Sequence, residues 1–200
     1  MRNPKDKDEV LTSCTFYLDE NLFNNNNPIH MEIGMGKGEF ILNMALNYPN
    51  INFIGVEKYS SVACVAIKKI RQYDVPNLKI MIVDACDLPE YLYGKIATIY
   101  LNFSDPWPKA RHEKRRLTHE NYLKVYDNLF GSKCHIVMKT DNDNLFAFSK
   151  ESLKNYGYNI IKESGDLHNE SINNIQTEYE RKFSSQGVKI KYLNVEKDNN

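Results

Sequence analysis

The sequence predicts an α/β fold of the doubly wound type, with a mainly parallel sheet and a C-terminal antiparallel strand. Short apolar runs alternate with segments of helical periodicity, and this alternation is typical of βαβ units with right-handed crossovers. Several of the apolar runs are also followed directly by glycine or by an acidic residue. In an open α/β sheet, the edge where parallel strands end is the place where ligands bind.

Length and composition are those of an ordinary globular protein. The chain has 200 residues, of which 42% are apolar and 26% charged, and it is long enough to bury a substantial core. We expect a single domain over residues 28–200, because a run of four asparagines followed by Pro28 is a linker signal. Residues 1–27 remain poorly assigned, although residues 10–23 could hold a short element.

The first half of the expected domain alternates between strands and helices. In residues 39–47 the apolar residues Phe40, Ile41, Met44 and Ala45 recur at the spacing of an amphipathic helix. Residues 60–73 have the same periodicity. Strands are expected at residues 29–33, 51–56 and 78–83, around helices at residues 39–47 and 60–73.

The second half continues the alternation after a short helical segment at residues 88–93. Residues 96–101 read as a buried strand, and Thr118 is expected to cap a helix over residues 118–130. A long stretch near the C-terminus has no clear period. The remaining expected elements are a strand at residues 134–138, a helix at residues 144–155 and an antiparallel strand at residues 188–195.

A glycine-rich loop, E-I-G-M-G-K-G from Glu32 to Gly38, follows the first expected strand. Glycine lacks a Cβ atom, so Gly34, Gly36 and Gly38 allow the backbone to approach a ligand closely. The dinucleotide fingerprint G-x-G-x-x-G would need glycine where the chain has Glu39. A neighbouring acid would also repel a pyrophosphate. A cationic ligand without phosphate fits better, and S-adenosylmethionine carries a sulfonium and an ammonium.

Acidic residues stand at successive strand ends. Glu57 lies about 20 residues beyond the glycine loop, where a carboxylate can accept both hydroxyls of a ribose. Asp84 could accept from an adenine amino group, and Glu32 could attract the ammonium. Each acid taken singly is more often an ordinary polar terminus. Together with the glycine loop, and in this order, they favour a binding site for S-adenosylmethionine.

The segment from Leu101 to Leu117 reads L-N-F-S-D-P-W-P-K-A-R-H-E-K-R-R-L. It places Asp105 and the chain's single tryptophan, Trp107, in a turn restricted by two prolines. Formal net charge is zero, so a polyanionic partner would need a local basic patch. A solvated surface run is the commoner role of such charges, but here they adjoin a strand end. The expected patch consists of Lys109, Arg111, Lys114, Arg115 and Arg116.

Four motifs resemble those of the bacterial tRNA (guanine-N7-)-methyltransferase family. They are E-I-G-M-G-K-G at Glu32, G-V-E-K at Gly55, the long segment at Leu101 and T-E-Y-E-R-K-F at Thr177. The resemblance implies methyl transfer from S-adenosylmethionine to N7 of the variable-loop guanine at tRNA position 46. It implies that Glu32, Glu57, Asp84 and Asp105 line the cofactor site, with Asp105 also catalytic. It further implies RNA contacts from Lys109, Asp141, Thr177, Glu178, Tyr179 and Glu180.

Two departures from the family pattern and three alternatives remain. Ala110 stands where the motif usually has a second lysine, and the region before Pro28 does not match. An amino-methyltransferase would carry [DNS]-P-P-[YFW], but here Trp107 follows Pro106 directly. A nicotinamide-dependent dehydrogenase is disfavoured by Glu39. An RNA-binding module without catalysis is disfavoured by the acids, since a pure binder gains nothing by facing carboxylates toward RNA.

The cysteines, the N-terminus and the hydropathy pattern bear on location and partners. The four cysteines are scattered without a C-x-x-C pair, as expected for reduced thiols in the cytoplasm and not for a zinc site. The five histidines are equally dispersed, so no metal is expected. No signal peptide or membrane-spanning run is evident. The expected partner is tRNA, without an obligate protein partner, and the oligomeric state is open.

Overall fold

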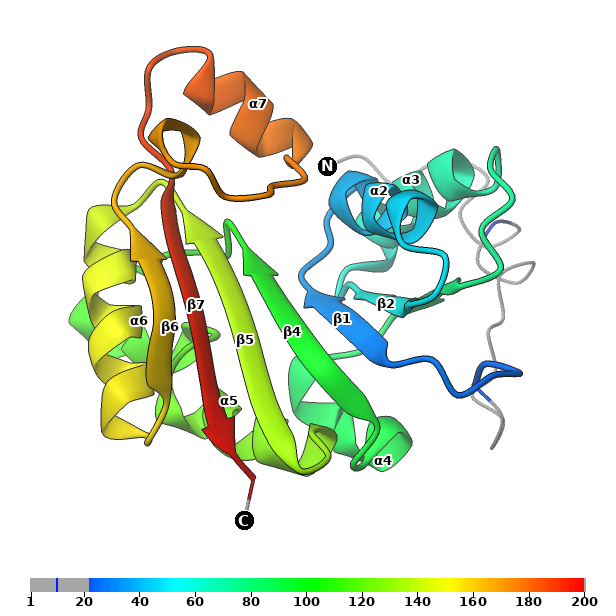
Figure 1. Ribbon diagram of the computed structural model, residues 1–200, viewed down its shortest axis with the longest axis horizontal. Helices are drawn as coiled ribbons and strands as arrows, with labels where there is room; N and C mark the ends of the chain where they lie inside the picture. Colours follow the sequence, from blue (N-terminus) through cyan, green and yellow to red (C-terminus); the bar gives the residue numbers. More distant parts are fainter. Residues whose placement is uncertain (1–9, 11–21, 200) are drawn as a thin grey trace.

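The computed structural model describes residue 10 and residues 22–199, and all seven of its strands belong to one sheet. The strand order is β3-β2-β1-β4-β5-β7-β6, and β1 to β5 run parallel, whereas β7 is antiparallel to both of its neighbours. The predicted fold class is therefore confirmed (Figure 1). The strands are β1 (Ile29–Ile33), β2 (Asn52–Val56), β3 (Leu78–Met81), β4 (Ile96–Asn102), β5 (Lys133–Thr140), β6 (Asn159–Ser164) and β7 (Lys191–Asp198).

Five helices pack in two layers, one on each face of the sheet, whereas α7 (Glu178–Ser184) lies over the strand ends (Figure 1). In β2 the fully buried Phe53 packs with α2 and α3, whereas the next residue, Ile54, packs with the core around α4, α5 and α6. Alternate residues of a strand point to opposite faces, so one apolar run serves both layers. The helices are α2 (Glu39–Asn47), α3 (Ser60–Ile70), α4 (Pro89–Leu92), α5 (Glu120–Leu129), α6 (Asp143–Asn155) and α7 (Glu178–Ser184).

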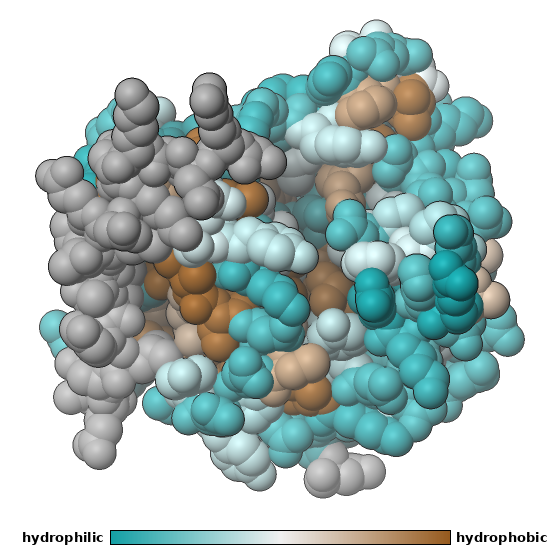
Figure 2. Space-filling model, turned by 180° about the vertical axis from the view of Figure 1, so that it is seen from behind, coloured by the Kyte–Doolittle hydropathy of each residue, from teal (hydrophilic) through white to brown (hydrophobic). Residues whose placement is uncertain are grey.

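The sheet order reverses between β1 and β4, the two strands that flank the topological switch point. Figure 1 shows α7 lying over the ends of β4 and β5, on the side toward which the parallel strands point. Figure 2 shows the molecule from behind the view of Figure 1, and the coloured surface there is mainly hydrophilic, with hydrophobic residues gathered in small groups. Within the described part of the chain, no helix is long and apolar enough to cross a membrane.

The predicted cap of α5 was wrong. The helix begins at Glu120, and the cap is His119, whose Nδ1 accepts from the backbone N–H of Asn121 at 3.2 Å. Thr118 is instead buried, and its hydroxyl lies 2.7 Å from the hydroxyl of Ser149 in α6. The Thr118 hydroxyl, which the sequence pattern predicts as a helix cap, is therefore used in a tertiary contact with α6.

Two elements were missed in the stretch that was expected to be irregular before residue 188. The strand β6 is mostly exposed at the edge of the sheet, so it shows no clean apolar alternation. The helix α7 has seven residues, too few for a hydrophobic period. The spacing of Thr177 and Glu180 is a capping-box signal that could have found α7. Most of the short element considered at residues 10–23 lies outside the described residues.

Candidate active site

The glycine loop is folded tightly against the end of β2. Gly34, Gly36 and Gly38 all have positive φ angles, of 79°, 56° and 72°. The N–H groups of Gly34 and Met35 both donate to the carbonyl of Val56, each at 2.9 Å. Residues other than glycine rarely adopt this left-handed conformation, so the sequence allows a turn here that few others would.

Two pockets lie on either side of this loop, and both are lined by Gly34 and Phe103. The β2–β3 pocket, of about 670 Å³, is lined mainly by residues after β2, β3 and β4, including Glu57, Asp84 and Asp105. The α7 pocket, of about 470 Å³, lies between the glycine loop, the end of β4 and α7. A ligand that extends past Gly34 and Phe103 would therefore occupy both pockets.

The three acids of the β2–β3 pocket are held in different ways. Glu57 is nearly buried, and its carboxylate accepts from the N–H groups of Gly36 at 3.2 Å and Tyr59 at 2.9 Å. Asp84 pairs with the ammonium of Lys58, which lowers the pKa of that carboxyl group. Asp105 is exposed, and its carboxylate has no hydrogen bond or ion pair to any described residue.

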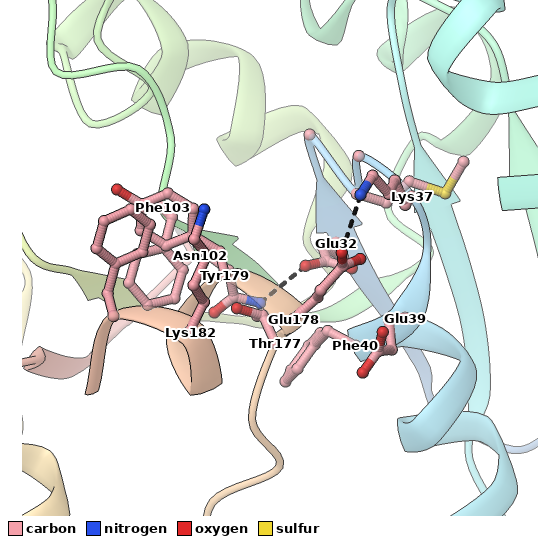
Figure 3. A pocket seen from close by; sticks show the side chains of 14 residues that line it. Glu32, Lys37, Glu39, Phe40, Asn102, Phe103, Thr177, Glu178, Tyr179 and Lys182 are labelled. Atoms are coloured by element: carbon pink, nitrogen blue, oxygen red, sulfur yellow. Dashed lines mark hydrogen bonds and ion pairs between the residues drawn. The ribbon is translucent and has the colours of Figure 1, made fainter. Parts of the chain in front are cut away.

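Glu32 lines the α7 pocket and is only 2% exposed (Figure 3). Burial raises its pKa to about 7, although the amide of Asn102 donates to its Oε1 at 2.8 Å. The Oε2 atom of Glu32 and the Oδ1 atom of Asn102 are both buried without a hydrogen-bond partner among the described residues. Buried polar atoms are normally paired, so two orphaned acceptors lining one pocket indicate a ligand that donates hydrogen bonds.

A buried ion pair fixes α7 over the site. Lys139 at the end of β5 and Glu180 in α7 are 2% and 0% exposed, and their charged atoms are 2.7 Å apart. Lys139 also donates to the side chain of Asn174 and to the carbonyl of Ile175. Desolvation lowers the pKa of Lys139. The Thr177 hydroxyl accepts from the N–H of Glu180 at 2.9 Å and so completes the capping box.

The exposed side of α7 reaches both halves of the site. Glu178 pairs with Lys37 of the glycine loop at 2.9 Å (Figure 3). The hydroxyl of Tyr179 donates to Asp141, after β5, at 3.0 Å, and its ring lies 4.9 Å from that of Phe103. The helix therefore connects the glycine loop to the ends of β4 and β5.

The five cations of the expected patch separate into two groups. Lys109, Arg111 and Lys114 are exposed, and the described residues hold none of them in an ion pair with a carboxylate. Arg115 is exposed too, but its guanidinium lies over the ring of Trp107, at 4.8 Å from its centroid. Arg116 is half-buried and donates to the backbone of the turn after Asp105.

The structure gathers most of the expected site residues around the two pockets. The four acids and the three glycines lie at or beside the glycine loop and the strand ends, and Asp141 and Thr177 to Tyr179 meet them across α7. Glu180 faces the interior and not the pocket. Sequence reasoning missed Asn102, Phe103 and Lys139. Lys139 alone gave a signal, as a charge at the end of an apolar strand.

The pockets fit S-adenosylmethionine in chemistry. The β2–β3 pocket offers three carboxylates, which can accept hydrogen bonds from the hydroxyl and amino groups of an adenosine. The other offers two unpaired buried acceptors, as an ammonium requires. No Cβ atom projects from Gly34 or Gly36, and the space around each is open. Among the described residues, no group of His, Cys, Asp and Glu could hold a metal ion.

Solved structures with a similar fold are also methyltransferases. An "antibiotic related Methyltransferase" aligns with a TM-score of 0.61 at 22% identity, over 99% of this chain and 96% of its own. A 16S rRNA (adenine(1408)-N(1))-methyltransferase from Catenulisporales acidiphilia, solved with its cosubstrate SAM, aligns with a TM-score of 0.58 at 16% identity, over 98% of this chain and 92% of its own. At these identities the likeness concerns the fold.

Sequence relatives are much more similar. A family model described as "Putative methyltransferase" matches residues 26–193. The tRNA (guanine-N(7)-)-methyltransferase of Geobacillus thermodenitrificans is 48% identical over 171 residues, which cover 84% of this chain and 79% of the relative. That of Bacillus subtilis is 46% identical over 177 residues, covering 88% and 83%. The chain therefore belongs to the tRNA (guanine-N(7)-)-methyltransferase family.

Proposed function

We propose that this protein methylates N7 of the variable-loop guanine at tRNA position 46, with S-adenosylmethionine as the methyl donor. The observation that carries the proposal is the pair of pockets that meet at Gly34 and Phe103, one with accessible carboxylates and one with orphaned buried acceptors. The family named above supports the same reaction.

Glu57 and Asp84 are the proposed contacts for the adenosine end of the cofactor. Glu57 is already oriented by two backbone N–H groups, which leaves its remaining lone pairs for the ribose hydroxyls. Asp84 would accept from the adenine amino group, after its exchangeable surface pair with Lys58 opens. Gly34 and Gly36 keep the intervening backbone free of side chains that would exclude a ligand. Gly38, also expected at the cofactor, instead faces α3, where a Cβ atom would lie 3.0 Å from that of Ala66.

Glu32 and Asn102 are the proposed acceptors for the α-ammonium. Among the described residues that line this pocket, Glu32 is the one buried side chain with an ionisable group. Lys139 is committed to Glu180, so no buried cation directly contacts Glu32. Because an ionised buried carboxylate needs a compensating charge, a cationic ammonium satisfies the site better than a neutral base.

The reaction itself requires mainly positioning and charge stabilisation. S-adenosylmethionine, when bound, supplies a methyl group attached to a cationic sulfonium. Guanine N7 has an in-plane lone pair and no proton to lose, so no general base is needed. Asp105 can stabilise the positive charge that develops on the ring, or accept from the N1–H and amino groups of guanine. Its exposed and unpaired carboxylate is suited to either role.

The proposed tRNA surface combines the exposed cations with the outer face of α7. Lys109, Arg111 and Lys114 are accessible to phosphates, and Glu178 and Tyr179 flank the pocket entrance. Thr177 and Glu180 would act by holding α7 in place. Trp107 either stacks on a base or packs against the basic segment, and the structure already pairs its ring with Arg115.

The decisive experiment is transfer of labelled methyl from S-adenosylmethionine to an unmodified transcript with guanine at position 46. Analysis of the nucleosides should find 7-methylguanosine, and a transcript with adenine at that position should stay unlabelled. Label in N6-methyladenosine or a methylcytosine would favour an amino-methyltransferase instead.

The proposed location is the cytoplasm, where tRNA would be the substrate. The structure is consistent with reduced thiols, because Cys64, Cys86 and Cys134 are free.

A further inference from the structure

Arg116 belongs to the basic run, but its side chain faces the turn that carries Asp105. Its Nε donates to the carbonyl of Pro106 at 3.0 Å, and its Nη2 donates to the carbonyl of Trp107 at 3.1 Å. Its guanidinium also lies over the ring of Phe148 in α6, at 4.3 Å from the centroid. Two of its donor groups and one face are therefore used inside the protein.

The turn to which Arg116 donates has two residues in an uncommon backbone conformation. Phe103 and Trp107, which flank Asp105 on either side, have φ angles of 51° and 42°. They are the two positive-φ residues other than glycine in the described part of the chain. Bulky residues seldom adopt this conformation, and they keep it only when surrounding contacts impose it. The contacts of Arg116 are therefore needed at the place where the backbone is least favourable.

We propose that Arg116 is a positioning residue that holds the turn so that the Asp105 carboxylate stays at the rim of the β2–β3 pocket. This inference rests on the proposed role of Asp105. It also divides the basic run by function, because Lys109, Arg111 and Lys114 face solvent and remain available to phosphates. Arginine suits the inner role, since its planar group bonds two carbonyls at once, which a lysine ammonium matches poorly.

The test compares Arg116→Gln and Arg116→Lys with Arg111→Gln. Arg111 is a matched control, because it is an exposed arginine of the same run, and its one side-chain hydrogen bond to a described residue goes to the neighbouring His112. Single-turnover methylation is measured at saturating tRNA and S-adenosylmethionine. The affinity for the same transcript is measured from low to high salt, and the thermal midpoint of each protein is recorded.

We expect Arg116→Gln to lower the single-turnover rate about 10- to 100-fold, as misplacement of a catalytic group does. The slope of log affinity against log salt should match that of the unaltered protein. Arg116→Lys should recover only part of the rate. Arg111→Gln should lower this slope by about one unit, because Arg111 belongs to the proposed tRNA surface.

Two results would overturn the inference. In one, Arg116→Gln lowers the slope of log affinity against log salt by about one unit and leaves the single-turnover rate at saturating substrates unchanged. Arg116 would then be a phosphate contact. The other is a lowered thermal midpoint with the saturated rate unchanged, because the residue would then serve stability alone. Failure of the proposed function would be distinct, since the unaltered protein would itself leave N7 unmethylated.

Discussion

The two pockets that meet at Gly34 and Phe103 are built in opposite ways. The β2–β3 pocket takes its acids from successive strand ends, and their partners lie in the same loop or in the adjacent one, as with Gly36 and Tyr59 for Glu57. The α7 pocket depends on buried charges from distant segments: Glu32 and Asn102 are 70 residues apart, and Lys139 and Glu180 are 41 residues apart. Changes to the acids of the β2–β3 pocket should therefore affect binding and chemistry, whereas loss of the buried pair between Lys139 and Glu180 should first affect stability.

The largest expected effect is a loss of stability, and it should distinguish two glutamates of α7, Glu180 and Glu178. Glu180→Ala leaves the buried Lys139 without its carboxylate, and we expect a loss of about 3–5 kcal/mol in the free energy of unfolding. Glu178→Ala is the control, because its pair with Lys37 is about half exposed and such pairs contribute at most about 1 kcal/mol. Denaturant unfolding measures both. Equal, small losses together with weaker tRNA binding would instead make Glu180 a direct substrate contact.

The next effect concerns the β2–β3 pocket. Asp105→Asn keeps the shape of the side chain and removes its charge, so we expect the single-turnover rate to fall about 100-fold. Affinity for tRNA should be retained, because repulsion from the phosphates decreases. The unfolding midpoint should also stay unchanged, since the side chain is exposed and unpaired within the described structure. A rate within a fewfold of the unaltered protein would remove Asp105 from the mechanism.

Glu57→Ala should weaken S-adenosylhomocysteine binding by roughly 1.5–3 kcal/mol, because it removes hydrogen bonds to a charged acceptor. The same loss is expected for 5′-methylthioadenosine, which keeps the ribose and lacks the amino-acid part. Calorimetry on the folded variant measures both affinities. Unchanged binding of both ligands would show that the ribose lies elsewhere.

Asn102→Leu provides the complementary measurement for the α7 pocket. It removes one of the two orphaned acceptors and also the amide that donates to Glu32. S-adenosylhomocysteine should therefore bind at least about tenfold more weakly, as expected for lost hydrogen bonds to charged groups. Affinity for 5′-methylthioadenosine, which has no ammonium, should not change. A loss for both ligands would mean that the variant alters the pocket generally. A loss in tRNA affinity alone would assign Asn102 to the guanine.

The smallest effect near neutral pH is a pH dependence that originates in the α7 pocket. The pKa of Glu32 is raised to about 7, chiefly by desolvation and slightly by Glu57, while Asn102 and Lys139 oppose the shift. An ammonium binds the ionised carboxylate, so affinity for S-adenosylmethionine should be full above pH 7. Below pH 7 it should fall by up to about tenfold per unit as Glu32 takes up a proton. Glu32→Gln should abolish this dependence, and the same slope in that variant would assign it to another group.

The sequence alone determined the architecture and one of the two pockets. Apolar runs and helical periods located β1 to β5, and Glu57, Asp84 and Asp105 could be placed at one edge because parallel strands end on the same side. These features depend on neighbours in the chain, and local patterns report them. The cap of α5 was mispredicted for the opposite reason: a contact with α6 uses Thr118.

Tertiary structure decided the rest. The α7 pocket depends on which distant polar groups meet in the interior, and sequence spacing does not encode the pairing of Lys139 with Glu180 or of Glu32 with Asn102. The basic run shows the same limit at short range. Its charge was readable, but whether Arg116 faces a phosphate or the carbonyls of Pro106 and Trp107 is set by the direction of the turn and by the ring of Phe148. Composition states which charges are present, and only packing determines which of them remain free.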